Sequence, residues 1–206
     1  MTYTFDHLLE AYSDIGVGPG KLVYVVSDLV RVRGYEKKLG QAVVDAHFQA
    51  LTQLLSTTGT LVVPSASMNL CGTDAPFDVA RTPTHKVGAL SEHVRKLVQA
   101  KRSFHPFVSY AAVGPNAAEI TEKVSRHAYG PHTPEARLIE MDALFVSVGL
   151  HPRESISTVH QVEHVTGVPY RYTKEFMHPV VRGEEISLEP FYLYVWYRDI
   201  DLKRDE

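Results

Sequence analysis

Cysteine is nearly absent from this sequence: Cys71 is the only one among 206 residues. It has no partner for an internal disulfide, and a cysteine-rich metal site is excluded as well. The scarcity fits a reducing compartment. The chain also lacks the run of about 18 apolar residues that spans a bilayer, and its first ten residues contain two acids instead of the apolar core of a signal peptide. We therefore predict a cytoplasmic protein without a membrane partner.

An excess of either charge is missing too. Lys and Arg number 21 against 24 Asp and Glu, and neither sign forms a long run. Domains that bind nucleic acids carry basic patches or stripes, so we predict no nucleic-acid partner. A small molecule remains as the expected ligand.

A phosphate-binding loop is the next absence. Such a loop follows a strand and opens a helix, whereas the glycines of GVGPGK, residues 16–21, precede an apolar segment typical of a strand. The Walker spacing also fails, because Ile15 stands at the first glycine position and Leu22 follows Lys21. We exclude a nucleotide phosphate site here.

Strand and helix patterns alternate along the chain. Clusters of β-branched and apolar residues predict strands at 21–27, 60–65, 107–113 and 142–150. Helical periodicity predicts helices at 40–57, 88–99 and 116–128, and a short helix after the turn at 130–134. The last 30 residues predict an aromatic β-hairpin, which we expect to make the sheet mixed. The alternation indicates an α/β fold, a single layered α/β/α domain over residues 1–206 with a mixed sheet and a C-terminal β-hairpin.

The segment STVHQVEHVTG, residues 157–167, places His160, Glu163 and His164 within one helical turn. Residues three or four apart share a helix face, so both histidines could hold one zinc ion, as in the H-x-x-E-H signature of inverted zinc peptidases. A catalytic zinc needs a third protein ligand, and the segment after His164 predicts a hairpin rather than a ligand helix. The other readings are a general base with a carboxylate helper and a solvated polar face. We predict no metal.

Several further segments occur in an order and spacing that resemble one family. They are TLVVPS at 60–65, FDVARTPTHKVGALSEHVR at 77–95, RSFHPFVSYAAVGP at 102–115, YGPHTPEARL at 129–138, ALFVSVGL at 143–150 and STVHQVE at 157–163. Together they resemble the aminoglycoside 3-N-acetyltransferase family of acetyl-CoA-dependent enzymes. The resemblance implies an N-acetyltransferase that moves an acetyl group from acetyl-CoA to an amino group of an amino sugar.

The resemblance implies that His160 is the catalytic base and that Glu163 assists it. An ammonium group has no free lone pair, so a base must remove a proton as the nitrogen attacks the thioester. An imidazole, with an ordinary pKa near 6.5, suits this task at neutral pH. Glu163 either orients the imidazole or binds the substrate ammonium, and the sequence leaves both roles open.

Ser157 stands where the family usually has a threonine hydroxyl. It is a candidate donor to the thioester oxygen as negative charge builds there. The alternative is that Ser157 or Thr158 caps the helix that bears His160.

The resemblance also implies a coenzyme A channel along RSFHP. Arg102 is expected to meet a phosphate, Ser103 the pantetheine amides, and Phe104 the same channel. For His105 we favour a structural role, ordering the turn before Pro106. Ser27, after the first strand, is a further candidate for contact with the pantetheine arm.

Three departures from the family pattern concern the acceptor. The family typically has His-Ser-Ser after the first strand, where this chain has Val26, Ser27 and Asp28. Asp28 either attracts an amine or caps a turn. Ile156 replaces a usual polar residue, and the C-terminal part is shorter than in typical antibiotic-modifying members.

An aminoglycoside is a polycation, so its site needs converging carboxylates. The candidates for substrate binding are Asp28, Asp74 and Glu92. A nucleotide-linked amino sugar is the alternative acceptor, and it would need basic and aromatic groups such as Arg81, Lys86, Arg171, Tyr170 and Tyr172. A coenzyme A-binding protein without catalysis is the alternative from another class. A homodimer is among the expected assemblies.

Overall fold

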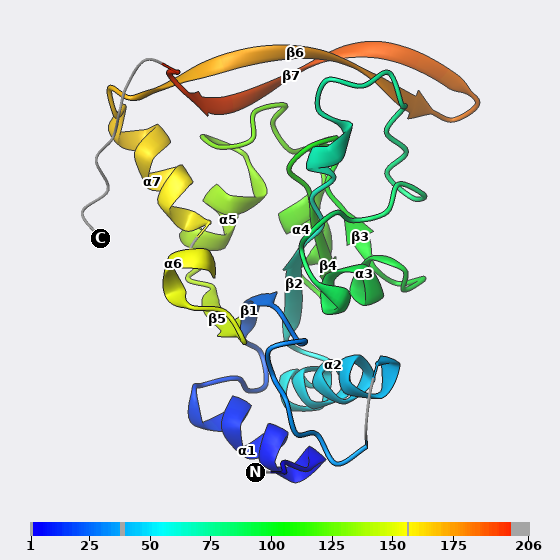
Figure 1. Ribbon diagram of the computed structural model, residues 1–206, viewed down its shortest axis with the longest axis vertical. Helices are drawn as coiled ribbons and strands as arrows, with labels where there is room; N and C mark the ends of the chain where they lie inside the picture. The colour runs from blue at the N-terminus through cyan, green and yellow to red at the C-terminus, as the bar shows by residue number, and fades with distance from the viewer. Residues whose placement is uncertain (1, 38–39, 156, 199–206) are drawn as a thin grey trace.

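The computed structural model describes residues 2–37, 40–155 and 157–198. It contains a five-stranded sheet with helices on both faces and a separate two-stranded hairpin (Figure 1). The main strands are β1 (Leu22–Ser27), β2 (Thr60–Pro64), β3 (Lys101–Arg102), β4 (Tyr110–Val113) and β5 (Leu144–Val148). The hairpin consists of β6 (Arg171–Arg182) and β7 (Glu185–Trp196). The helices are α1 (Phe5–Asp14), α2 (Gln41–Leu55), α3 (Ala89–Arg95), α4 (Ala117–Thr121), α5 (Pro134–Glu140), α6 (Pro152–Ser155) and α7 (Thr158–Thr166), with a 3-10 turn, η1, at Met68–Leu70.

The strand order is β3-β4-β2-β1-β5, with β1 parallel to β2 and β5, and β4 antiparallel to β2 and β3. The predicted α/β fold with a mixed sheet is therefore confirmed. The expected cause of the mixing was wrong, because β4 reverses direction within the main sheet while the hairpin forms its own sheet. That 1–206 is one domain stays a prediction.

Both faces of β1 are buried, which explains why its sequence is apolar without alternation. Val23 and Val25 pack in the core that contains α1, α2 and α3, whereas Leu22 and Tyr24 pack in the core that contains α4 and α5. Successive side chains of a strand point to opposite faces, so one short strand contributes to both cores. This is the layered arrangement expected from the sequence.

Helices α1 and α4 are among the elements that differ from the predicted ones. Helix α1 was not predicted; it begins with a capping box in which the Thr4 hydroxyl accepts from the His7 N–H, and it buries Leu8 and Tyr12. Helix α4 is shorter than the predicted 116–128, because Ala128 and its neighbours pair with the hairpin instead of continuing the helix.

The hairpin lies along the end of the molecule remote from α1 and α2 (Figure 1). Its two outer edges are tied to loops. The N–H of Phe77 donates to the carbonyl of Pro179 at 2.9 Å, and the N–H of Ala128 donates to the carbonyl of Tyr192 at 2.8 Å. Val180 and Phe191 on its inner face are fully buried in a third apolar cluster. The hairpin thus closes the top of the sheet. Within the described ranges, no helix is long and apolar enough to cross a membrane.

Candidate active site

A cavity of about 1520 Å³ opens at the carboxyl ends of the parallel strands. Its lining includes Ser27 and Asp28 at the end of β1, Pro64 at the end of β2, and Leu150 beyond β5. In open α/β sheets, ligands bind outside these strand ends. His160 and Glu163 of α7 complete one wall, so the cavity joins the sheet to the helix with the candidate base.

His160 and Glu163 are in direct contact. Nδ1 of His160 lies 2.9 Å from Oε2 of Glu163, and the ring of Tyr129 packs edge-on against the imidazole with centroids 5.4 Å apart. The two residues are three apart on α7, which places them on one helix face. A carboxylate can only accept and a guanidinium can only donate, so the contact with Glu163 favours a proton on Nδ1, whereas NH2 of Arg171, 3.2 Å from the same Nδ1, favours one on Nε2.

Three groups surround the Glu163 carboxylate. The Tyr170 hydroxyl donates to Oε1 at 3.0 Å, and Nε of Arg171 lies 2.9 Å from Oε2 as an ion pair without the angle of a hydrogen bond. Burial raises the pKa of Glu163, but the hydrogen bonds from His160 and Tyr170 and the charge of Arg171 outweigh it and hold the pKa below its usual value. Glu163 is therefore an anion that is already paired, which favours the orienting role over capture of a substrate ammonium.

Ser157 precedes α7 but does not cap it with its side chain. Its hydroxyl donates to Oε1 of Glu135 at 3.2 Å and lies 3.2 Å from the hydroxyl of Tyr24. Glu135 is fully buried and also accepts from the Tyr110 hydroxyl. Burial raises the pKa of Glu135. Because Ser157, Tyr24 and Tyr110 line the cavity, this chain of hydroxyls forms part of its floor.

The chain that forms this cavity and its His160–Glu163 dyad is similar to known proteins. A model of the family described as aminoglycoside 3-N-acetyltransferase matches residues 27–206. The chain belongs to this family. Aminoglycoside N(3)-acetyltransferase IV from Salmonella sp is 35% identical over 160 residues, 76% of this chain and 57% of that protein. The chain thus spans less than two thirds of that relative's length.

Two solved structures of acetyltransferases of this kind superpose well. A histidine-to-alanine mutant of aminoglycoside acetyltransferase AAC(3)-IVa in complex with a gentamicin has a TM-score of 0.74 and 27% identity, covering 93% of this chain and 70% of that one. AAC-IIIb in a binary complex with CoASH has a TM-score of 0.82 at 21% identity, covering 95% of this chain and 77% of that one. The second likeness concerns the fold alone.

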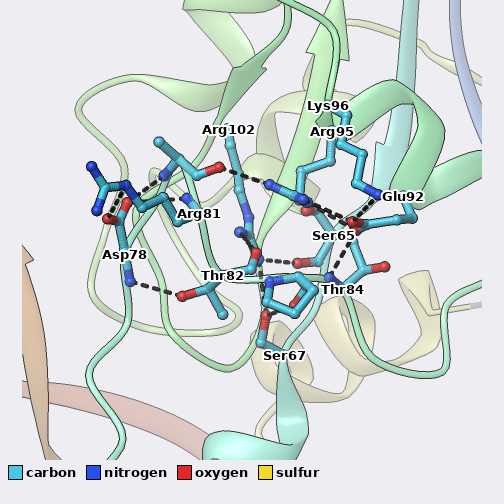
Figure 2. A network of polar contacts seen from close by, with 12 residues as sticks. Ser65, Ser67, Asp78, Arg81, Thr82, Thr84, Glu92, Arg95, Lys96 and Arg102 are labelled. Carbon is cyan, nitrogen blue, oxygen red and sulfur yellow. Dashed lines mark hydrogen bonds and ion pairs between the residues drawn. The ribbon is translucent and has the colours of Figure 1, made fainter.

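Arg102 forms its hydrogen bonds with groups of the protein. Its guanidinium donates to the carbonyls of Thr82 and Ser65, each at 2.6 Å, and to the Ser67 hydroxyl at 2.9 Å (Figure 2). It does not line the cavity. These donors are used within the protein, and contact of Arg102 with a coenzyme phosphate stays a prediction.

Ser103 and Phe104 also lie outside the cavity lining. The Ser103 hydroxyl is buried and accepts from the Tyr110 N–H at 2.9 Å. Phe104 packs on Phe77 and under the guanidinium of Arg182, 3.6 Å from its ring centroid. Both residues make contacts within the protein, and their contact with coenzyme A stays a prediction.

His105 has the structural role favoured from the sequence. It is 2% exposed, and its Nδ1 accepts from the N–H groups of Phe107 and Val108 at 3.2 and 3.0 Å. These two bonds order the turn around Pro106. Burial lowers the pKa of His105 to about 3, so the ring is neutral at physiological pH.

The substrate-binding candidates separate in space. Asp28 lines the cavity, where its Oδ1 accepts from the Val30 N–H at 3.2 Å and its Oδ2 pairs with Arg31 at 3.0 Å. It therefore caps a turn and also faces the site. Asp74 and Glu92 do not line the cavity. Glu92 binds Arg95, Lys96 and the Thr84 N–H (Figure 2), which lowers its pKa to about 2 despite burial.

The remaining candidates divide similarly. Lys86 and Arg171 line the cavity, whereas Arg81, Tyr170 and Tyr172 do not. Ile156 lies outside the described residues. Among the described residues, no group of three or more His, Cys, Asp or Glu side chains is arranged to hold a metal ion. His164 points elsewhere than His160: its ring packs against Tyr194 and the His127 ring.

Proposed function

We propose that this chain catalyses acetyl transfer from acetyl-CoA to an amino group of an aminoglycoside-type amino sugar. The observation that carries the proposal is the contact of His160 with Glu163 in the wall of the cavity. Membership of the aminoglycoside 3-N-acetyltransferase family supports it, as does the name of the Salmonella relative. The gentamicin complex of the AAC(3)-IVa mutant supports an aminoglycoside acceptor.

In this proposal His160 is the general base. Glu163 holds the Nδ1 proton, and Nε2 takes a proton from the amine as the nitrogen attacks the thioester carbonyl. The C–N bond forms, the tetrahedral state collapses, and the C–S bond breaks. The imidazolium then gives its proton to the departing thiolate of coenzyme A, so His160 returns to its neutral form. The amine enters this step in its neutral form, so one proton passes from its nitrogen through His160 to the sulfur of coenzyme A.

Further groups of the cavity support acetyl-CoA as the donor. The Ser27 hydroxyl is 4% exposed and has no hydrogen-bond partner among the described residues, which suits contact with a pantetheine amide. Lys86 and Arg153 line the cavity, and neither side chain forms an ion pair with a described residue, so we assign them to coenzyme A phosphates. Ser157 stays the candidate donor to the thioester oxygen, supported by its place on the cavity floor.

The setting of the reaction belongs to the same proposal. A free cysteine, Cys71, fits the reducing cytoplasm that was expected from the sequence. The contacts among His160, Glu163 and Arg171 form within one chain. The homodimer stays a prediction.

The test is release of free thiol from acetyl-CoA with a panel of aminoglycosides and nucleotide-linked amino sugars. We expect turnover with aminoglycosides, and a decrease of about a hundred-fold or more in kcat in His160→Ala with nearly unchanged affinity for acetyl-CoA. His164→Ala is the matched control on the same helix and should keep its turnover. Tight coenzyme binding without thiol release for any amine would identify a binding protein instead. Stoichiometric zinc that is lost in His164→Ala would restore the metal alternative.

A further inference from the structure

Arg171 is the first residue of β6, and its side chain contacts both His160 and Glu163 of α7, which together form the candidate dyad. Its Nε lies 2.9 Å from Oε2 of Glu163, the same oxygen that contacts His160. Its terminal nitrogen NH2 lies 3.2 Å from Nδ1 of His160. One guanidinium therefore contacts the candidate base and the carboxylate that orients it.

The guanidinium is fixed in this position. The Arg171 side chain is 5% exposed, its other terminal nitrogen donates to the Tyr194 carbonyl at 3.1 Å, and its central carbon lies 4.4 Å from the Trp196 ring centroid. A side chain held on three sides does not turn to meet a diphosphate. This placement replaces the role of Arg171 in binding a nucleotide-linked sugar.

Two electrostatic effects of this arrangement act in the same direction. A positive charge 3.2 Å from Nδ1 repels a protonated imidazole, because like charges disfavour the charged form. The same guanidinium also neutralises part of the Glu163 charge that would otherwise stabilise the imidazolium. Both effects of the guanidinium disfavour the addition of a proton to the His160 imidazole.

The other groups that face His160 do not supply this charge. Tyr129 packs on the ring and is neutral, since burial raises its pKa well above the usual value. Glu135 on α5 is an acid whose electrostatic coupling to His160 favours the charged imidazole. Tyr170 is bound to Glu163. Arg171 is the cation next to the base among these neighbours.

We propose that Arg171 is a positioning residue that fixes the Glu163 carboxylate and keeps His160 in its neutral, proton-accepting form at physiological pH. The inference rests on the proposed function of His160 as the base. The proposal gives the hairpin a part in the chemistry, because β6 supplies the guanidinium that acts on the His160 imidazole.

The experiment compares pH profiles of kcat/KM in wild type and Arg171→Gln. Without the guanidinium, we expect the acid limb to move to higher pH by about one unit, while the rate on the alkaline plateau stays within a few-fold of wild type. Arg171→Lys keeps a charge but loses the planar fork, so a smaller shift is expected. Arg182→Gln is the matched control, because it removes an arginine from the other end of β6 and should leave the limb in place.

NMR titration of the His160 imidazole is the second measurement, and it does not depend on turnover. The midpoint should rise in Arg171→Gln, or in Arg171→Met if the glutamine variant does not fold, since methionine keeps an apolar stem against Trp196. A lower plateau with an unmoved limb and an unmoved midpoint would make Arg171 merely structural and overturn the inference. Absent turnover in wild type would reject the proposed function, whereas the titration would still decide the place of Arg171.

Discussion

Two clusters in this molecule are each built around an arginine, and they differ in the groups that the arginine contacts. Arg171 pairs with a carboxylate that is shared with a histidine at the wall of a cavity. Arg102 of β3 donates to backbone carbonyls and a serine hydroxyl, and its central guanidinium carbon lies 5.0 Å from the Phe77 ring centroid. Arg102 uses all three of its guanidinium nitrogens as hydrogen-bond donors, whereas Nε of Arg171 forms an ion pair without the angle of a hydrogen bond.

The difference shows that the partners of an arginine, more than its type, decide its role. Backbone carbonyls do not titrate, so Arg102 can only fix the loop that contains Thr82 against the sheet. Glu163 and His160 do exchange or stabilise protons, so a guanidinium between them changes the chemistry. We therefore predict that the contacts of Arg171 affect the rate of the reaction, and that the contacts of Arg102 affect the stability of the fold.

The largest effect that sharpens this comparison is expected for Arg102→Ala. Removal of the guanidinium leaves several buried acceptors without donors, which should lower the free energy of unfolding by about 3 kcal/mol. Urea unfolding measures the change. Arg81→Ala is the control, because the Arg81 side chain is 90% exposed and should contribute little. An unchanged stability with a raised KM for acetyl-CoA would place Arg102 at the cofactor site.

A second prediction concerns pH. Burial lowers the pKa of His105 to about 3 and that of His47 to about 4, so between these values and about 6.5 the unfolded chain binds protons that the folded chain does not. Stability is therefore complete above pH 6.5 and falls as the pH decreases, by about 1.4 kcal/mol per unit for each ring. Thermal unfolding at pH 7, 6 and 5 measures this slope.

The variant His105→Asn keeps an oxygen that can accept the amides of the turn but cannot titrate. Its stability should fall less steeply with decreasing pH than that of wild type. Equal slopes in the two proteins would mean that His105 becomes protonated in the folded state, so that the fold does not lower its pKa.

The smallest effect is expected on the cavity side, for Ser27→Ala. The free protein loses a buried hydroxyl without a described partner, so its stability should stay the same or rise. Affinity for acetyl-CoA should decrease by about five-fold, the worth of roughly one hydrogen bond. Calorimetric titration with coenzyme A provides the measurement. Reduced stability with unchanged affinity would place Ser27 among the structural residues.

The parts that the sequence predicts correctly are those set by local spacing. The strands at β1 and β2 follow from apolar runs, and the contact of His160 with Glu163 follows from their separation of three on a helix. The direction of β4 is set by pairing with a strand more than 40 residues earlier, which no local pattern encodes.

The same limit applies to the contacts of the site residues. Whether Arg102 meets a phosphate or a carbonyl depends on loops that are distant in sequence, such as the one at Thr82. The contact of Arg171 with Glu163 was not predicted, because it depends on how β6 is placed against α7. A cation that follows a His-x-x-Glu segment by eight residues is a signal that could have suggested the contact.

The hairpin shares no strand pairing with the five-stranded sheet in the described part of the chain, and its edges are tied to two loops. Small units of this kind open with less free energy than the core they cover. Because Arg171 belongs to the hairpin, we expect that heating separates its guanidinium from His160 before the five-stranded sheet unfolds. The stability of the two-stranded hairpin would then limit the temperature at which the protein is active.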